Sequence, residues 1–281
     1  MPSPSEEKVI TPALLSDWAL PDPEGSKEAR GTILVIGGAR RTPGAVLLAG
    51  VAALRAGAGR LQLAVADEAA VALSIAVPEA LVVGLTTPGE ATGEILELVR
   101  EADVILLGPG LDDIDDSVRL MGSVLGEARE DTAVVLDAYA LGALSKAPES
   151  LRQRRAVLTP NVTEAGHLLG REPGDDLAGA ARELAERYRA VVSLYGHIAE
   201  PEGGCWREES ADAGLGTSGS GDVRAGIVAG LLGRGAGPAQ AACWAAYAHS
   251  MSGRRLAPAF SRTGFLAREL VDEVPRTIAM I

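Results

Sequence analysis

The sequence predicts an α/β fold in which a mostly parallel sheet carries helices on both faces. Short apolar runs rich in β-branched residues alternate with alanine-rich stretches of helical length, which is the pattern of βαβ units. The chain has 281 residues, of which 47% are hydrophobic, so it can bury a large core. We expect residues 1–30 to form an N-terminal arm and first helix region, and residues 31–281 to form a single domain.

The first expected unit is a strand over residues 32–36, a helix over 44–59 and a second strand over 60–65. The helical run ends at glycine, which is a common stop signal. Further buried strands are expected over residues 103–108, 133–138, 156–160 and 190–196.

The C-terminal third has a different pattern. The segment 197–210 carries a Pro-Glu-Gly-Gly turn between two short runs, which predicts a hairpin at the edge of the sheet. Two helices are expected after it, over about 222–233 and 238–253, because Pro238 is a helix-start residue and Gly253 a helix stop.

The charge and hydropathy of the chain limit its partners. The formal net charge is −12 and there is no run of Lys or Arg, so binding to nucleic acid or to an anionic membrane surface is not expected. The N-terminus lacks a basic region followed by an apolar core, and no apolar run reaches the roughly 18 residues of a membrane span. We therefore expect a soluble, cytoplasmic protein.

The cysteines and histidines show no metal-binding pattern. Cys205 and Cys243 lack the spacing of a zinc site or a disulfide framework, which also agrees with the cytosol. The histidines at 167, 197 and 249 are too scattered to indicate a metal site, so each is expected to be solvated or satisfied in the core.

Glycine-rich turns follow two of the expected strands. The stretch ILVIGGARRTPGA runs through Gly37 and Gly38 into a helix, and LLGPGLDD follows the strand at 103–108. Open α/β sheets bind ligands at such carboxyl ends. Taken alone the first turn is a weak signal, because G-x-G-x-x-G is absent and a tight βα turn explains the glycines equally well.

The stretch TSGSGDVRAG predicts a phosphate site. Gly219, Ser220 and Gly221 precede an expected helix, whose first N–H groups and positive dipole end favour a transferring phosphoryl group. Asp222 falls in the first turn. A plain stabilising acid would account for Asp222 but not for the flanking glycines and serines, so we interpret Asp222 as a general base that accepts a hydroxyl proton.

The stretch LTPNVTEAGHLLG has two interpretations. Asn161 can cap the following helix and Glu164 lies three residues later, which is the spacing of a capping box. Alternatively, the pair orders water around a magnesium ion that bridges nucleotide phosphates.

Together these motifs resemble the ribokinase-like superfamily and, within it, the ADP/ATP-dependent NAD(P)H-hydrate dehydratases. The similarity covers residues 10–255. The glycine turn after the first strand, the GPGLD segment, the stretch VVLDAYAL and the closing stretch GLGTSGSGDVRAG occur in family order. The resemblance implies a three-layer ribokinase-like fold, with a mostly parallel central sheet, helices on both faces and an edge hairpin.

The resemblance also implies a repair reaction. Hydrated NADH or NADPH would be phosphorylated on its ring hydroxyl by ADP or ATP, with Mg²⁺ as cofactor, and elimination of phosphate would restore the coenzyme. Asp222 would be the base, and the amides of Gly219, Ser220 and Gly221 would hold the phosphoryl group. A cytoplasmic homotetramer is implied as well.

The remaining site residues follow from the same resemblance. The substrate pocket would be lined by Ala45, Gly110, Asn161 and Asp222. The nucleotide would contact Gly196, Thr217 and Gly221, and Glu164 would hold magnesium through water.

Several residues depart from the family pattern. Asn161 stands in place of a histidine, Tyr195 in place of a lysine near the nucleotide phosphates, and Tyr139 in place of an acid. Asp112 replaces the last glycine of GPGLG, and Thr42 lies near the place of a missing aromatic residue.

A replacement for the missing lysine could come from Arg40, Arg41 or Arg224, although each is expected on the surface, where arginine usually lies. Two alternatives therefore stand beside the dehydratase. One is a kinase for a small alcohol or vitamin precursor, which would keep Asp222 but omit the elimination step. The other is a catalytically weakened homologue that only binds nucleotide.

Overall fold

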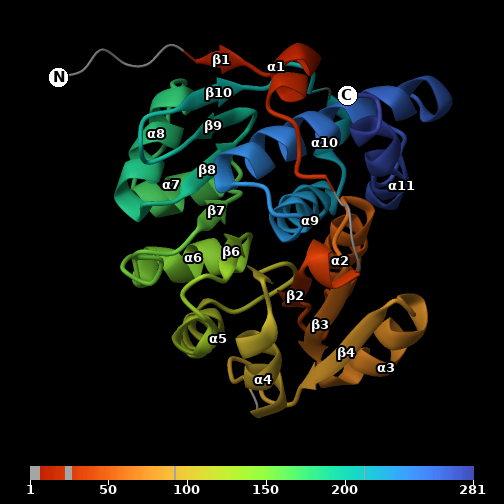
Figure 1. Cartoon of the computed structure of the whole chain (residues 1–281). Coiled ribbons are helices and arrows are strands. Elements are labelled where there is room, and N and C mark those ends of the chain that lie inside the picture. Colours follow the sequence, from red (N-terminus) through yellow and green to blue (C-terminus); the bar gives the residue numbers. More distant parts are fainter. Residues whose placement is uncertain (1–6, 23–26, 92, 212) are drawn as a thin grey trace.

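The strands form a single mixed sheet. The computed structural model describes residues 7–22, 27–91, 93–211 and 213–281. The strands are β1 (Lys8–Val9), β2 (Thr32–Ile36), β3 (Arg60–Ala66), β4 (Ala80–Leu85), β5 (Val104–Leu107), β6 (Ala133–Leu136), β7 (Ala156–Leu158), β8 (Val191–Leu194), β9 (His197–Ala199) and β10 (Cys205–Arg207). Their order is β1-β10-β9-β8-β7-β6-β5-β2-β3-β4 (Figure 1). Only the β8–β9 and β9–β10 pairs are antiparallel, so the predicted mostly parallel sheet with a hairpin is confirmed.

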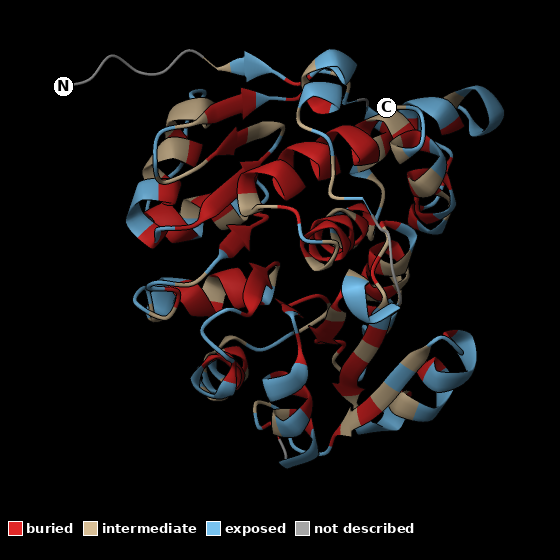
Figure 2. Cartoon of the chain, viewed as in Figure 1, coloured by how far each residue is buried: buried red, intermediate tan, exposed pale blue. Residues whose placement is uncertain are grey.

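Helices cover both faces of this sheet. They are α1 (Pro12–Asp17), α2 (Gly44–Arg55), α3 (Asp67–Ala76), α4 (Gly93–Glu101), α5 (Ile114–Glu127), α6 (Tyr139–Lys146), α7 (Val162–Leu169), α8 (Leu177–Tyr188), α9 (Ser220–Gly233), α10 (Pro238–Phe260) and α11 (Ala267–Ile278), with short 3₁₀ turns η1 (Lys27–Arg30) and η2 (Ala213–Gly216). One core cluster joins the sheet to α2, α9, α10 and α11, and a second joins its other face to α4 through α8. The buried residues in Figure 2 accordingly concentrate on the strands and on the sheet-facing sides of the helices. This is a three-layer architecture.

The main differences from the sequence prediction are the ends of two helices and one additional strand within the parallel sheet. Helix α2 ends at Arg55 rather than at residue 59, because the chain turns at Gly57, whose φ is 112°. Strand β4 was not predicted. Helix α10 continues past Gly253 to Phe260; a Cβ at Gly253 would lie 2.9 Å from Leu215 Cδ2, so this glycine serves close packing rather than helix termination.

The strand order reverses between β2 and β5, and this reversal positions the site. From β2 the chain proceeds to β3 and β4 on one side, whereas β5 leads to β6 and β7 on the other. The turns that leave the two strands meet: Gly38 N donates to Pro109 O (2.8 Å) and Ala39 N to Gly110 O (2.8 Å). Open α/β sheets bind ligands at such a switch point, at the carboxyl ends of the strands.

Helices α2 and α9 lie against each other at backbone distance and run in the same direction. A Cβ at Gly226 would lie 2.1 Å from Ala49 O, and one at Gly230 would lie 2.3 Å from Ala53 O. The two pairs are each separated by four residues, so one face of α2 stays in register with one face of α9. The glycines are therefore required by the approach of the two helices.

The described part of the N-terminal segment packs onto the domain. Leu15 of α1 is fully buried, and the rings of Trp18 and Trp206 stack with centroids 5.6 Å apart. Trp18 O accepts hydrogen bonds from Trp244 Nε1 (2.9 Å) and Gln240 Nε2 (3.0 Å) of α10. None of the helices in the described residues is both long and apolar enough to span a membrane.

Candidate active site

The start of helix α9 has the geometry of an anion cradle. Its N-cap Gly219 is left-handed, with φ at 86°, and a Cβ there would lie 2.5 Å from Leu48 Cδ1. The sequence predicted that Ser220 and Gly221 precede this helix. The helix instead begins at Ser220, so both residues lie in its first turn. Backbone N–H groups at a helix start, together with the helix dipole, bind phosphate without a side chain between them and the ligand.

Asp222 lies in this first turn and is half-buried. Burial raises the pKa of its carboxyl to about 7, and the negative charges of Asp137 and Glu164 contribute to the shift. A carboxyl that titrates near neutrality can accept a proton from a hydroxyl and release it again, so its pKa suits a general base.

Three further charged side chains act on the site around Asp222: Asp137 is buried, and Glu164 and Arg224 are half-buried. Asp137, at the end of β6, accepts a hydrogen bond from Thr159 Oγ1 (2.7 Å), and burial raises the pKa of its carboxyl. Arg224 Nη2 donates to Thr159 O (2.8 Å) at the end of β7. The guanidinium of Arg224 offsets the effect of burial on the pKa values of Asp137 and Glu164. The sequence suggested that Arg224 lies on the surface, and this expectation is wrong because its guanidinium is held among these groups.

Asn161 and Glu164 form the predicted capping box at the start of α7. Asn161 Oδ1 accepts from Glu164 N (2.9 Å), and Glu164 Oε2 accepts from Asn161 N (2.8 Å). Burial raises the pKa of Glu164, and the charge of Asp137 adds to the rise. The two interpretations of these residues are compatible, because the cap fixes the position of a carboxylate that also faces the charged group.

The structure brings Ala45 and Gly110 together. Gly110 has φ at 71°, and a Cβ on it would lie 2.9 Å from Ala45 Cβ and 3.2 Å from Gly38 Cα. Thr42 Oγ1 donates to Gly110 O (2.7 Å) and holds the two turns together. The glycines Gly226 and Gly230 of α9 face Ala49 and Ala53 of α2, and the same register continued by one turn toward the helix starts pairs Asp222 with Ala45. The expected substrate residues Ala45, Gly110 and Asp222 therefore share one region.

A cavity of about 600 Å³ opens at the α9 start, where Gly221 and Arg224 contribute to its lining. Its lining includes four of the expected site residues, which are Asn161, Gly196, Ser220 and Gly221. Thr217 and Asp222 are not part of the lining, although Gly216 is. Tyr195 lies at the rim, 73% exposed and left-handed with φ at 48°.

His249 of α10 was not predicted as a site residue. Its Nε2 lies 2.8 Å from Ser220 Oγ, and its ring lines the same cavity. Burial lowers its pKa to about 3, and the charge of Arg224 adds to this effect, so the ring is neutral at pH 7. The expectation of a histidine satisfied in the core is met, but this one also fixes the side chain of Ser220 at the cradle.

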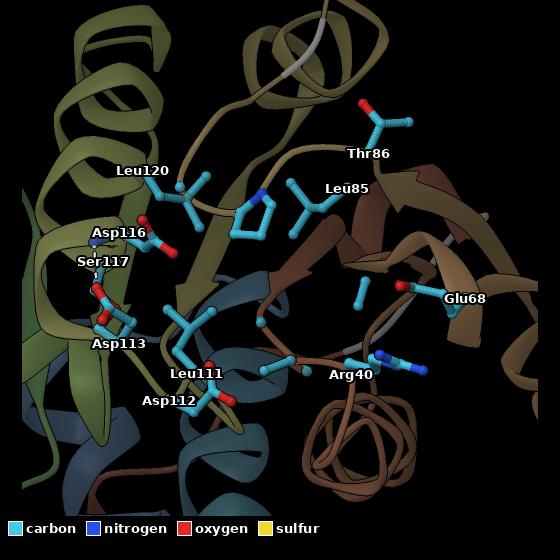
Figure 3. A pocket seen from close by; sticks show the side chains of 16 residues that line it. Arg40, Glu68, Leu85, Thr86, Leu111, Asp112, Asp113, Asp116, Ser117 and Leu120 are labelled. Atoms are coloured by element: carbon cyan, nitrogen blue, oxygen red, sulfur yellow. Dashed lines mark hydrogen bonds between the residues drawn. The ribbon is translucent and has the colours of Figure 1, made fainter.

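A second cavity, of about 290 Å³, begins beside Gly110 and extends over the ends of β2 to β5. Figure 3 shows Asp113 and Asp116 on the α5 side and Arg40 and Glu68 on the opposite side. Asp113 Oδ1 caps α5 by accepting from Asp116 N (2.8 Å). Asp112, where the family pattern has glycine, also lines this cavity.

Sequence reasoning missed Asp137 and His249 as contributors to the site. Asp137 could have been found, because an acid directly after a buried strand lies at the carboxyl edge of the sheet. His249 lies inside the alanine-rich helix α10, far from Ser220 in sequence, and carries no local signal. The other departures are located as follows: Tyr139 begins α6 and is 40% exposed, and Arg40 and Arg41 are exposed.

Comparisons with known proteins agree with this arrangement. The family model for NAD(P)H-hydrate dehydratase matches residues 33–276. The ADP-dependent (S)-NAD(P)H-hydrate dehydratase of Xanthomonas campestris is 40% identical over 285 residues, which cover 95% of each chain. A crystal structure of the ADP/ATP-dependent NAD(P)H-hydrate dehydratase from Bacillus subtilis, co-crystallised with ATP and Mg²⁺, has a TM-score of 0.86 and 29% identity, over 98% of this chain and 99% of that one.

A ribokinase-like superfamily protein from Enterococcus faecalis has the same fold, with a TM-score of 0.86 at 24% identity over 98% of this chain and 96% of that one. The predicted ribokinase-like three-layer fold is thereby confirmed. The family model matches most of the chain, and the 40% identity to the Xanthomonas protein extends over 95% of both chains. This chain is therefore a member of the NAD(P)H-hydrate dehydratase family.

Proposed function

We propose that this protein repairs hydrated NADH or NADPH by ADP- or ATP-dependent dehydration. The observation that carries the proposal is Asp222, a carboxyl whose pKa is raised to about 7 in the first turn of a helix that begins with a left-handed glycine. Base and phosphate cradle are thus adjacent, as the transfer of a phosphoryl group to a hydroxyl requires.

In the first step Asp222 accepts the proton of the ring hydroxyl while the hydroxyl oxygen attacks the terminal phosphorus of the nucleotide. The bond from phosphorus to the nucleotide's bridging oxygen breaks, and ADP becomes AMP or ATP becomes ADP. The amides near Gly219, Ser220 and Gly221 stabilise the transferring phosphoryl group, and little reorganisation is needed because they are fixed by the helix. In the second step the C–O bond breaks, phosphate leaves, and loss of a neighbouring ring proton restores the double bond.

In this proposal the substrate and the nucleotide meet at the α9 start, where the substrate residue Asn161 also lines the nucleotide cavity. The hydrated nicotinamide lies among Ala45, Gly110, Asn161 and Asp222. The nucleotide lies in the larger cavity and contacts Gly196, Thr217 and Gly221. The close backbone contact of α2 with α9 supports this assignment, because it keeps Ala45 and Asp222 in a fixed relation.

Magnesium fits the donor set as a cation held through water. The charge of Asp137 helps to raise the pKa of Glu164, and the charges of Asp137 and Glu164 help to raise the pKa of Asp222, an excess of negative charge that a divalent cation would relieve. Within the described residues no three His, Cys, Asp or Glu side chains form a metal cage. We therefore propose that Glu164 would hold Mg²⁺ through water, and that the chemistry the ion would supply is neutralisation of phosphate charge.

The direct test supplies purified protein with hydrated NADH, Mg²⁺ and either ADP or ATP. The near-ultraviolet absorbance of the reduced nicotinamide ring should return, together with release of inorganic phosphate. Asp222→Asn should bind nucleotide with nearly unchanged affinity but show no turnover. A stable phosphorylated product without phosphate release would instead indicate a kinase. No absorbance change with either donor, while a dehydratase control is active, would rule the proposal out.

We propose a homotetramer, as the resemblance implies. The alanine-rich part of α10 is buried within the chain, so it is not the contact surface. Val71 and Ile75 of α3 are 73% and 76% exposed, and Leu81 of β4, the last strand in the sheet order, is 51% exposed. These side chains support an apolar contact between subunits. Sedimentation analysis of the protein and of Val71→Glu/Ile75→Glu tests it, with a smaller particle expected for the variant.

The cytoplasm remains our proposed compartment. Cys205 and Cys243 are both buried, and no disulfide joins them. Thiols kept apart in this way suit a reducing environment.

A further inference from the structure

Negative charges near the larger cavity would repel the phosphates of a nucleotide. A nucleoside di- or triphosphate carries several negative charges, and the protein itself has a formal net charge of −12. The carboxyls of Asp137 and Glu164 lie close enough to Asp222 at the α9 start for their charges to raise its pKa. Helix amides alone supply only partial positive charge. A basic side chain near the phosphates would add to the neutralisation that the proposed Mg²⁺ supplies.

Arg224 is the one permanently charged basic side chain in the described lining of that cavity. The other titratable basic group there, His249, has a pKa lowered to about 3 by burial and by the charge of Arg224, so it carries no charge at pH 7. Tyr195, where the family resemblance expects a lysine, adds no positive charge. Arg224 lies two residues after Asp222 and three after Gly221, on the same helix end.

The guanidinium of Arg224 is held in place but not saturated. Its Nη2 donates to Thr159 O (2.8 Å), which fixes one side of the fork. Its Nε is buried and has no hydrogen-bond partner among the described residues. A buried donor without a partner is unfavourable, and a guanidinium offers a planar fork that matches phosphate oxygens. The carboxylates of Asp137 and Glu164 attract the guanidinium and so help to orient it.

We propose that Arg224 is the phosphate-binding cation of the nucleotide site and takes the place of the lysine that Tyr195 replaces. The inference rests on the proposed function, in which the nucleotide occupies the larger cavity. Arg224 then has two contacts: Thr159 on the protein side and the nucleotide phosphates on the cavity side. The anionic nucleotide meets a cation at the helix start, while the adenosine part of the ligand does not depend on Arg224.

The test measures binding of ADP with Mg²⁺, and of adenosine, to the full-length protein by titration calorimetry. Arg224→Met should weaken ADP binding by about tenfold to a hundredfold, because a charge-assisted hydrogen bond to phosphate is lost. Adenosine, which lacks phosphate, should bind with unchanged affinity. Arg224→Lys should fall between the wild type and Arg224→Met, because lysine keeps the charge but not the fork.

Arg234 provides a matched control at the other end of α9. It is also half-buried, has an unpartnered Nε, and donates to two backbone carbonyls, Ala56 O (3.4 Å) and Pro21 O (3.2 Å). Arg234→Met should lower the melting temperature without changing ADP affinity. Equal losses of ADP and adenosine binding in Arg224→Met would show a merely structural role and overturn the proposal, as would ADP binding at the wild-type level.

Arg224→Lys serves as a second variant in case Arg224→Met does not fold. If Arg224→Met does not fold, because Asp137 and Glu164 lose their compensating charge, Arg224→Lys decides: ADP affinity equal to wild type would overturn the proposal, and a selective loss for ADP would support it. A failure of the proposed function can be distinguished from a failure of the Arg224 proposal. Wild-type protein that binds ADP through Arg224 but does not restore NADH would refute the dehydratase and leave the role of Arg224 intact.

Discussion

The carboxyl of Asp222 controls the proposed reaction through its ionisation. Burial, with the charges of Asp137 and Glu164, raises its pKa to about 7, so a large fraction is protonated at neutral pH. The base must be ionised to accept the hydroxyl proton. We predict that kcat/KM rises with pH and levels off above a midpoint near 7. Bound phosphates add negative charge, so the midpoint of kcat should lie higher. A profile that is flat from pH 6 to 8 would contradict this assignment.

The same pKa makes a prediction for stability. In the folded protein Asp222 titrates near 7, whereas an unfolded aspartate titrates near 3.8, so the folded state holds the extra proton in this pH range. Its contribution to stability therefore falls as pH rises from about 4 through 7. Asp222→Asn removes the buried charge, so its gain in the free energy of unfolding over the wild type should be larger at pH 8 than at pH 5, by about 2 kcal/mol. Urea denaturation at both pH values tests this, and an equal difference at both would refute it.

At the residue level the sequence indicated Asp222, the proposed base, but not its surroundings. Asp222 stands out because glycines and serines flank it in one local stretch. Asp137, His249 and the burial of Arg224 depend on strand ends and helices that lie far apart in the sequence and meet only in the fold. A pattern read within one stretch cannot show which distant carboxylates will raise a pKa.

At the level of the elements, the contact between α2 and α9 leaves no space for a side chain larger than glycine at Gly226 or Gly230. Gly226→Ala would place a Cβ 2.1 Å from Ala49 O, a backbone atom that cannot move without shifting the helix. We expect a loss of about 2–3 kcal/mol in stability, together with a lower kcat because Asp222 lies one turn away. Gly122→Ala in α5 is the control, since a Cβ there meets nothing within 4 Å. It should be neutral or stabilising by up to about 1 kcal/mol. Denaturation of both variants decides the matter, and equal effects would contradict the packing argument.

The alternating pattern predicted the strands and helices of the parallel sheet because each buried strand is a continuous apolar run. Strand β4 escaped prediction because it is the edge strand beside β3 and is half-exposed, so its run ALVVGL lacks a clear buried character. The end of α10 was misplaced for a different reason. Gly253 has the residue type of a helix stop, and only the contact with Leu215 shows that it is a packing position.

At the level of the whole molecule, the N-terminal segment contributes to the main core. Leu15 is fully buried in the cluster that includes α9 and α10. Leu15→Ala should reduce the free energy of unfolding by about 2–5 kcal/mol. Asp17→Ala, an exposed change in the same helix, should stay within about 0.5 kcal/mol. Chemical denaturation followed by circular dichroism compares the two. A Leu15 variant as stable as wild type would show that α1 is not part of the cooperative core.

All the tryptophans of the chain lie where that segment meets the sheet. Trp18 stacks on Trp206, and Trp244 donates to the carbonyl of Trp18. Intrinsic emission is therefore a probe of one corner, far along the sheet order from the β2–β5 switch point. It will follow detachment of the N-terminal segment during unfolding. Occupancy of the phosphate cradle needs a different reporter, such as a fluorescent nucleotide or a probe placed on the rim.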